Sequence, residues 1–183
     1  MIELLRYIIS PSLSHTSKWP NQIWALIEET NFKIEFYIDK FHDICFILTN
    51  NSNFETFETY FAGYEVEYWS DELRKWLERI VKGSKHTLLM YNAESLEPSL
   101  WFYIKDNRYY FKVIEEYSPL RPPFFEVQII NLGSFVNEIY TKYLQLLQDL
   151  VKKKDDNQHI SSWNESLKSF KSSKIENYLN SNF

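Results

Sequence analysis

The residues best suited to nucleophilic chemistry are His42, Asp43 and Cys45, which lie close together in the sequence. A thiol and an imidazole can act as nucleophile and base when they come within hydrogen-bonding distance. The run ICFILTN around the cysteine predicts a strand, in which Asp43 and Cys45 share one face and His42 lies on the other. The spacing therefore does not predict a catalytic Cys–His pair, and Cys45 is interpreted as a buried, inert thiol.

The sequence also does not predict a metal site or a glycine-rich phosphate-binding loop. The histidines lack the short spacings of a metal site, and there is no second cysteine; they are His15, His42, His86 and His159. Carboxylates are numerous, but no acid–base pair stands out, and the GxSxG motif is absent. With only three glycines, no glycine-rich phosphate cradle can form. We predict no catalytic residue, no metal and no cofactor, and we interpret the protein as not being an enzyme.

The most distinctive stretch is NFETFETYFAGYEVEYWSDE, residues 53–72, which holds seven aromatic residues, six acids and no Lys or Arg. In one interpretation the aromatic rings pack into the hydrophobic core, and the acidic side chains lie on the opposite face, exposed to solvent. In the other, acids and exposed tyrosines form a surface for a cationic partner, because Tyr anchors interfaces and carboxylates pair with Arg. The core interpretation and the partner-surface interpretation are compatible. The predicted partner-binding residues are Glu55, Glu58, Tyr60, Tyr64, Glu65, Glu67 and Asp71.

Charge is distributed unevenly along the chain. Residues 1–149 hold 21 acids and 14 basic residues, a net of −7, whereas residues 150–183 hold 4 acids and 6 lysines, a net of +2. Binding of nucleic acid depends on clustered Lys and Arg, so nucleic acid is not expected as the primary ligand. The acidic body favours a basic protein partner.

The compartment can be predicted from the cysteine count and the hydropathy pattern. One cysteine allows no intramolecular disulfide and fits a reducing environment. Glu3 and Arg6 interrupt the apolar N-terminal segment, which therefore does not resemble a signal peptide. No run approaches the roughly 20 apolar residues of a membrane span. We expect a soluble, cytoplasmic protein that does not bind membranes.

Several strands are predicted by alternating or continuous apolar patterns. NFKIEFYID alternates apolar and polar residues, and ICFILTN suits a central strand. WPNQIWALIEE fits either a short helix or a strand. Phe54, Phe57 and Phe61 recur at helical spacing, which favours a helix, whereas residues 64–68 alternate as a strand with an acidic outer face.

The helices are predicted by their caps and apolar stripes. Ser70 is expected to cap a helix over 70–82, which Gly83 ends. Further along, KHTLLMYN and FFEVQII predict strands, and SLWFYIKDNRYYFKVIEEY predicts a hairpin that turns at Asp106 and Asn107. Asn131 is expected to cap a long helix over 132–152.

Together these elements predict an α+β fold, with one antiparallel sheet of about five to six strands packed against helices near 70–82 and 132–152. Residues 1–150 are expected to form a single α+β domain. Residues 151–183 are predicted to be a linker and a helical appendage, because Ser162 with Glu165 and Ser173 with Glu176 match capping boxes. These short helices either pack back on the body or stay mobile.

The run LRKWLERIVKGSKHTLLMYNAESLEPSLWFYIKDNRYYFKVIEEY, followed by a strand and a long helix, resembles small bacterial immunity proteins. These are the inhibitors encoded beside polymorphic toxins or toxins of contact-dependent growth inhibition. The resemblance covers about residues 30–150 and rests on a short helix with a WL core, a Tyr strand, a hairpin after EP and a closing helix. It implies a cytoplasmic protein that binds one toxin domain tightly and blocks it, and it implies no catalytic residues.

The expected function is therefore that of an immunity protein, which neutralises a cognate toxin through an acidic-aromatic surface. The acidic body suggests that the toxin is a basic nuclease. An alternative is an inhibitor encoded by a phage or another mobile element, which would bind a different basic protein by the same chemistry. A third and less favoured alternative is an enzyme with a noncanonical pocket.

Overall fold

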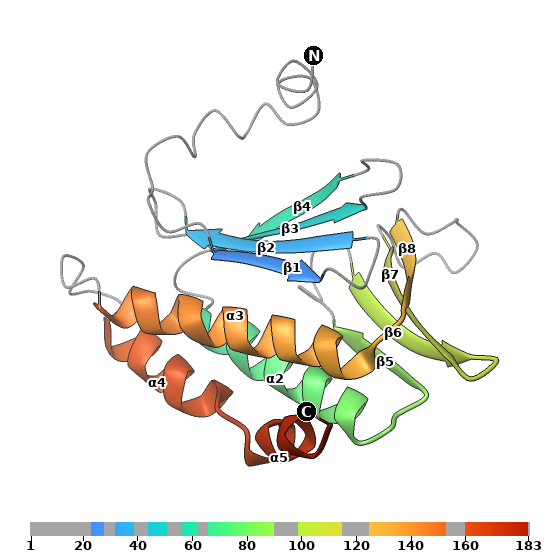
Figure 1. The fold of residues 1–183 in the computed structure, drawn as a ribbon. Helices are drawn as coiled ribbons and strands as arrows, with labels where there is room; N and C mark the ends of the chain where they lie inside the picture. The colour runs from blue at the N-terminus through green and yellow to red at the C-terminus, as the bar shows by residue number, and fades with distance from the viewer. Residues whose placement is uncertain are drawn as a thin grey trace.

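The computed structural model describes residues 23–27, 32–38, 44–50, 56–61, 66–89, 99–114, 125–152 and 160–182. Within these ranges the protein is α+β, with two four-stranded antiparallel sheets and the helices α2 to α5 (Figure 1). The α+β class is confirmed. The prediction of one sheet with five to six strands is wrong, because each sheet has four strands and helix α2 separates them along the chain.

The first sheet has the order β1-β2-β3-β4, in which neighbours in the sheet are also neighbours in the sequence. Residues 23–27 form a strand, the second of the two predicted alternatives. The helix expected from the spacing of Phe54, Phe57 and Phe61 is not formed over 56–61, the part that the structure describes; Phe57 instead pairs with Leu48 in β3. Thr and aromatic residues favour strands, and pairing with β3 outweighs the helical spacing. The bounds are β1 (Ile23–Ile27), β2 (Phe32–Ile38), β3 (Ile44–Asn50) and β4 (Thr56–Phe61).

The second sheet, of order β5-β6-β7-β8, contains the predicted hairpin. Asp106 and Asn107 join β6 to β7 with φ angles of 51° and 59°. Two successive positive φ values define the type I′ turn, which matches the twist of a hairpin and which Asn tolerates. The hairpin and its turn are confirmed. The bounds are β5 (His86–Leu89), β6 (Ser99–Lys105), β7 (Arg108–Ile114) and β8 (Phe125–Ile129).

Helix α2 (Val66–Val81) begins earlier than predicted. Residues 66–68 are helical, so the strand expected over 64–68 is wrong where the structure describes it. Ser70 lies inside the helix and donates a hydrogen bond to the Val66 carbonyl at 2.5 Å, so it is not the cap. An apolar stripe at spacings of three and four residues drives the helix, because it buries one face. The buried apolar residues are Val66, Trp69, Leu73, Trp76, Leu77 and Ile80.

The end of α2 agrees with the prediction. Gly83 has φ 84°, and its N–H bonds the Ile80 carbonyl at 2.9 Å. The N–H of Ser84 bonds the Arg79 carbonyl at 3.0 Å. This pair of bonds is a Schellman motif, in which glycine adopts the left-handed conformation at no steric cost.

The remaining helices are α3 (Leu132–Lys152), α4 (Ile160–Phe170) and α5 (Ser173–Asn182). The Asn131 cap is confirmed, since its Oδ1 accepts a hydrogen bond from the Ser134 N–H at 3.0 Å. Helix α4 begins at Ile160, so Ser162 lies inside it and does not cap it. Helix α5 begins at Ser173, and its first hydrogen bond runs from the Glu176 N–H to the Ser172 carbonyl at 3.0 Å, so Ser173 lies inside the helix and does not cap it. The Glu176 carboxylate accepts a hydrogen bond from the Tyr140 hydroxyl at 3.1 Å.

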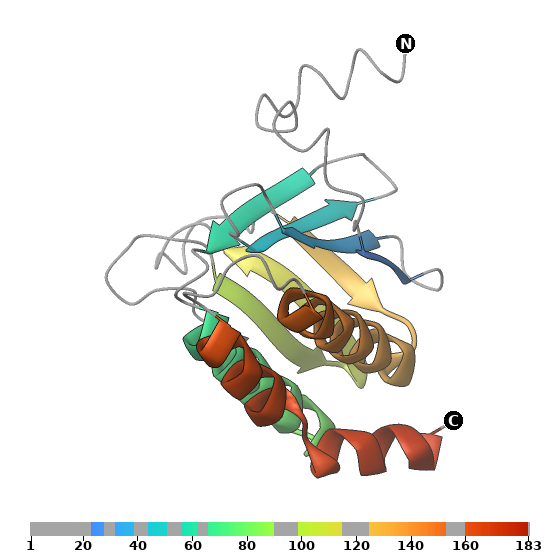
Figure 2. The same cartoon turned by 90° about the vertical axis from the view of Figure 1, so that its left-hand side faces the viewer.

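The hydrophobic core lies between the helices and the two sheets, with α3 packed on β1 and β2 and α2 packed on β5. Helix α4 lies along α2 (Figure 2), and Trp163 and Phe170 are fully buried. Trp76 of α2 meets Phe111 of β7 edge-on, with ring centroids 6.1 Å apart. Phe36 of β2 meets Tyr143 of α3 in the same way at 5.5 Å. The C-terminal helices thus pack back on the body, and the domain boundary after residue 150 stays a prediction.

Candidate functional site

The structure describes four of the seven predicted partner-binding residues, and these lie on two different elements. Glu55, Tyr64 and Glu65 lie outside the described residues. Glu58 and Tyr60 lie on β4, where they are in register with Ile47 and Cys45 of β3. The last two, Glu67 and Asp71, lie in the first turns of α2. The structure therefore brings together Glu67 and Asp71, which are four residues apart on one face of a helix.

The exposed start of α2 also carries an aromatic residue that the sequence analysis did not select. Tyr68 is 57% exposed, and it follows the exposed Glu67 directly. The strand pattern assigned Tyr68 to the same face as Val66, which is fully buried. Extending the helical stripe of α2 back to Val66 would have placed Tyr68 on the polar face, four residues before Glu72. We call Glu67, Tyr68, Asp71 and Glu72 the acidic-aromatic end of α2.

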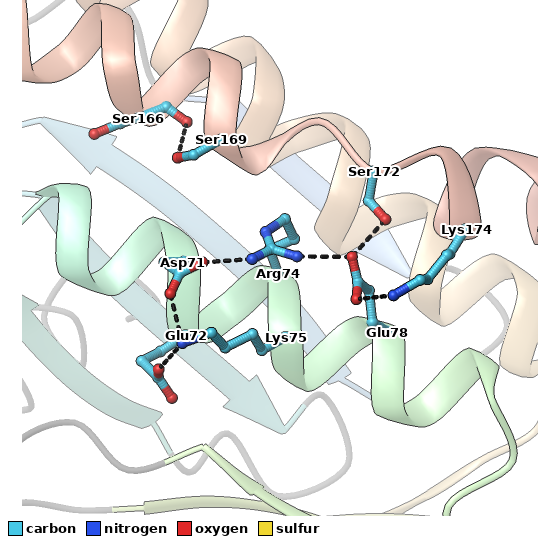
Figure 3. Close-up of polar contacts among 9 residues, drawn as sticks. All are labelled: Asp71, Glu72, Arg74, Lys75, Glu78, Ser166, Ser169, Ser172 and Lys174. Atoms are coloured by element: carbon cyan, nitrogen blue, oxygen red, sulfur yellow. Dashed lines mark hydrogen bonds and ion pairs between the residues drawn. The ribbon is translucent and has the colours of Figure 1, made fainter.

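Two of these acids are held by basic side chains one turn further along α2 (Figure 3). Asp71 pairs with Arg74 at 2.5 Å and with Lys75 at 2.6 Å, and Glu72 pairs with Lys75 at 2.9 Å. Burial raises the pKa of Asp71, but the hydrogen bonds from Lys75 and Arg74 outweigh it and hold this pKa below its usual value. Among the described residues Glu67 has no such partner. Its carboxylate charge is therefore the least compensated at this end.

The same row of charges continues into a contact between α2 and the start of α5. Glu78 accepts hydrogen bonds from Arg74 at 2.8 Å, Ser172 at 2.7 Å and Lys174 at 3.1 Å, and Figure 3 shows these groups meeting at its carboxylate. The Glu78 side chain is only 16% exposed. Burial raises its pKa, but the three hydrogen bonds outweigh that effect and lower it. Glu78 therefore acts as a structural link between helices.

A buried hydrogen bond fixes the acidic-aromatic end on the core. The Ser70 hydroxyl lies 3.0 Å from the hydroxyl of Tyr143 in α3, and both residues are fully buried. Burial raises the pKa of Tyr143 well above its ordinary value. Ser70 lies between Tyr68 and Asp71 in the helix, so this bond sets how α2 presents both side chains.

The other residues considered for chemistry are not assembled into a site in the described part of the chain. His42 and Asp43 lie outside the described residues, Cys45 lies on β3, and His86 is exposed at the start of β5. Among described side chains, no group of three or more His, Cys, Asp or Glu is arranged to hold a metal ion. None of the described helices has the length and apolar content that crossing a membrane requires.

Comparisons with family models, curated proteins and solved structures found no match to this chain.

Proposed function

We propose that the protein is an immunity protein, which binds a basic toxin domain of the nuclease type and neutralises it through the acidic-aromatic end of α2. The observation that carries this proposal is the exposure of Tyr68, 57%, directly beside the exposed and uncompensated Glu67. A tyrosine combines apolar area with a hydroxyl that can form hydrogen bonds, so an exposed one beside a free carboxylate can contact a partner in both ways.

The chemistry of this surface suits a cationic partner. An uncompensated carboxylate can accept paired hydrogen bonds from an arginine of the partner. Tyrosine is enriched among the residues that dominate binding energy, especially when weaker contacts around it exclude water. Asp71 and Glu72 are paired with Arg74 and Lys75, so the free charge at this end is that of Glu67, which would speed the approach of a basic surface.

The rigidity of α2 supports the same function. The helix is anchored by its buried stripe, by the Ser70–Tyr143 bond and by the Glu78 contacts with α5. A side chain on such a helix loses little freedom on binding, so more of the contact energy becomes affinity. This is the property expected of an inhibitor that must bind one target tightly.

The test is a pull-down from the native host with tagged wild-type protein, Tyr68→Ala and Glu67→Lys as baits. We expect the wild type to retain one basic protein in stoichiometric amount. Tyr68→Ala should weaken binding by about 30-fold, the effect of losing a residue that dominates an interface. Glu67→Lys should slow association and change its salt dependence.

Glu165→Lys is the matched control, because Glu165 is an exposed glutamate on α4 with a side chain 61% exposed. It should bind like the wild type. Retention of the C-terminal domain of a large secreted protein would favour immunity, whereas a host defence enzyme would favour the mobile-element inhibitor. If Tyr68→Ala and Glu67→Lys bind the retained protein as well as the wild type does, this surface is not the interface.

A further inference from the structure

A groove lies at the other end of α2, between its last turns and helix α5. Its volume is about 520 Å³, within the range of roughly 300–1,000 Å³ of small-molecule sites. Four of its seven lining residues are cationic, and one is acidic. The lining residues are Lys75, Glu78, Arg79, Val81, Lys82, Lys174 and Tyr178.

Two of the four cations are uncompensated. Lys75 pairs with Asp71 and Glu72, and Lys174 pairs with Glu78. Arg79 and Lys82 are exposed, and neither has an ion-pair partner among the described residues. They are three residues apart, so they project from the same face of α2. Together they leave two positive charges at the groove.

Glu78 forms no ion pair with Arg79 or Lys82 among the described contacts, because other donors hold its carboxylate. One oxygen accepts hydrogen bonds from Arg74 and Ser172, and the other accepts from Lys174. An external anion can therefore meet Arg79 and Lys82 without displacing a carboxylate from them.

The helix dipole alone does not explain this collection of cations. Cations at the end of a helix are favoured by the negative end of its dipole, which accounts for Arg79 in the last turn of α2 and for Lys82 directly after it. Lys174, however, lies in the first turn of α5, where a dipole disfavours a cation. Cations from two helices thus meet at one groove, and Lys174 is held there by its ion pair with Glu78 rather than by the dipole of its own helix.

The groove also has an apolar side. Val81 and the partly buried Tyr178 line it beside the cations. Cations beside apolar atoms suit a ligand with an anionic head and an apolar or aromatic body. A phosphate monoester carries a charge of about −1.5 to −2 at pH 7, which matches the two uncompensated cations, whereas a carboxylate carries one charge.

We propose that this groove binds a phosphate monoester carried on an aromatic or apolar body. The phosphate lies against Arg79 and Lys82, and the body covers Val81 and Tyr178. The two cations that meet the phosphate lie far from the centre of the proposed partner surface: Glu67 and Lys82 are fifteen residues apart, about 22 Å along the helix axis. The two surfaces touch only through Lys75, which lines the groove and pairs with Asp71 and Glu72. Both sites can be occupied at once, so the failure of one proposal leaves the other standing.

The test is an NMR titration of ¹⁵N-labelled protein with phenyl phosphate at pH 7.5. We expect saturable shifts of the amides of 79–85 and 174–178, with a Kd below about 1 mM. Arg79→Gln and Lys82→Gln should each weaken binding by about three- to tenfold. Binding should weaken at pH 5, because the second pKa of a phosphate monoester is about 6.

Two controls separate a specific site from general charge attraction. Lys168→Gln removes an exposed lysine of α4, whose side chain is 72% exposed, and should leave the titration unchanged. Phenyl sulfate, a monoanion of similar shape, should bind more weakly than phenyl phosphate. Equal binding of the two, equal weakening by Lys168→Gln or shifts that do not saturate by 20 mM would overturn the proposal.

Parallel titrations with uridine 5′-monophosphate and a short phosphotyrosine peptide identify the source of the phosphate. Tighter binding of the nucleotide indicates a free metabolite, and tighter binding of the peptide indicates a modified protein side chain. Both results support the site if the shifts map to the groove. A circular dichroism spectrum of each variant checks that it is folded.

Discussion

The hydrogen bond between Ser70 and Tyr143 predicts that substituting its two partners lowers the stability of the fold by different amounts. A serine hydroxyl has one proton, and that of Ser70 is donated to the Val66 carbonyl at 2.5 Å. Tyr143 must therefore donate to the Ser70 oxygen across the 3.0 Å contact. Tyr143→Phe removes the donor and leaves the Ser70 proton bonded, whereas Ser70→Ala leaves a buried tyrosine hydroxyl without an acceptor.

The magnitudes follow from this difference. Tyr143→Phe should cost about 1 kcal/mol, the net value of one hydrogen bond. Ser70→Ala should cost about 2 kcal/mol, because an unpaired buried hydroxyl costs roughly 1–3 kcal/mol and alanine returns about 0.5 kcal/mol through its helix propensity. The double mutant should be no less stable than Ser70→Ala alone, because Phe removes the stranded hydroxyl. The coupling energy then has a magnitude of at least about 1 kcal/mol.

The assay is urea unfolding followed by tryptophan fluorescence, with the free energy of unfolding compared at constant m-value. Ser181→Ala is the matched control: Ser181 makes the same type of bond to the carbonyl four residues back, at 2.8 Å, but is exposed. It should change stability by less than about 0.5 kcal/mol. Additive effects, or a larger loss for Tyr143→Phe than for Ser70→Ala, would refute the assigned direction of the bond.

Three further predictions concern stability. The pKa of Glu78 is lowered by folding, so its contribution is present above its unfolded pKa and is lost as pH falls through the folded value. Glu78→Gln should therefore flatten the loss of stability below about pH 5 in urea unfolding, whereas the exposed Glu165→Gln should not. Trp163→Ala should cost about 3–5 kcal/mol if α4 belongs to the cooperative core, and a loss under about 1 kcal/mol would show that α4 unfolds separately. Asn107→Ala should be about 1 kcal/mol less stable than Asn107→Gly by thermal unfolding, because φ is 59° there; equal stability would contradict the turn type.

Elements whose start or end is determined by a few consecutive residues could be predicted from the sequence. The hairpin at Asp106 and Asn107, the end of α2 at Gly83 and the cap at Asn131 each depend on residues within one turn. The start of α2 was missed because residues 64–68 alternate like a strand over a window that is too short to decide. Burial of Val66 in the stripe of α2 settles that choice, and it depends on packing against the rest of the fold.

The grouping of side chains into sites could not be predicted, because it depends on contacts between distant residues. The division into two sheets is decided by which strands pair, and similar apolar runs do not specify their partners. The bond between Glu78 and Ser172 joins residues 94 positions apart, and no local pattern marks it. Lys174 belongs to the segment predicted as a helical appendage, and only the fold brings it to the groove beside Arg79.

The order of the strands has a consequence for folding kinetics. In both sheets every strand pairs with its neighbours in the chain, so each sheet closes only short loops. The contacts of α2 with α4 and α5 require much longer loops, which form more slowly. We therefore expect pulsed hydrogen exchange during refolding to show protection of β6 and β7 before α4, and the reverse order would contradict this. Before α4 docks, the stripe of α2 that ends at Ile80 would lack part of its cover, so we expect aggregation during refolding to be greatest at that stage.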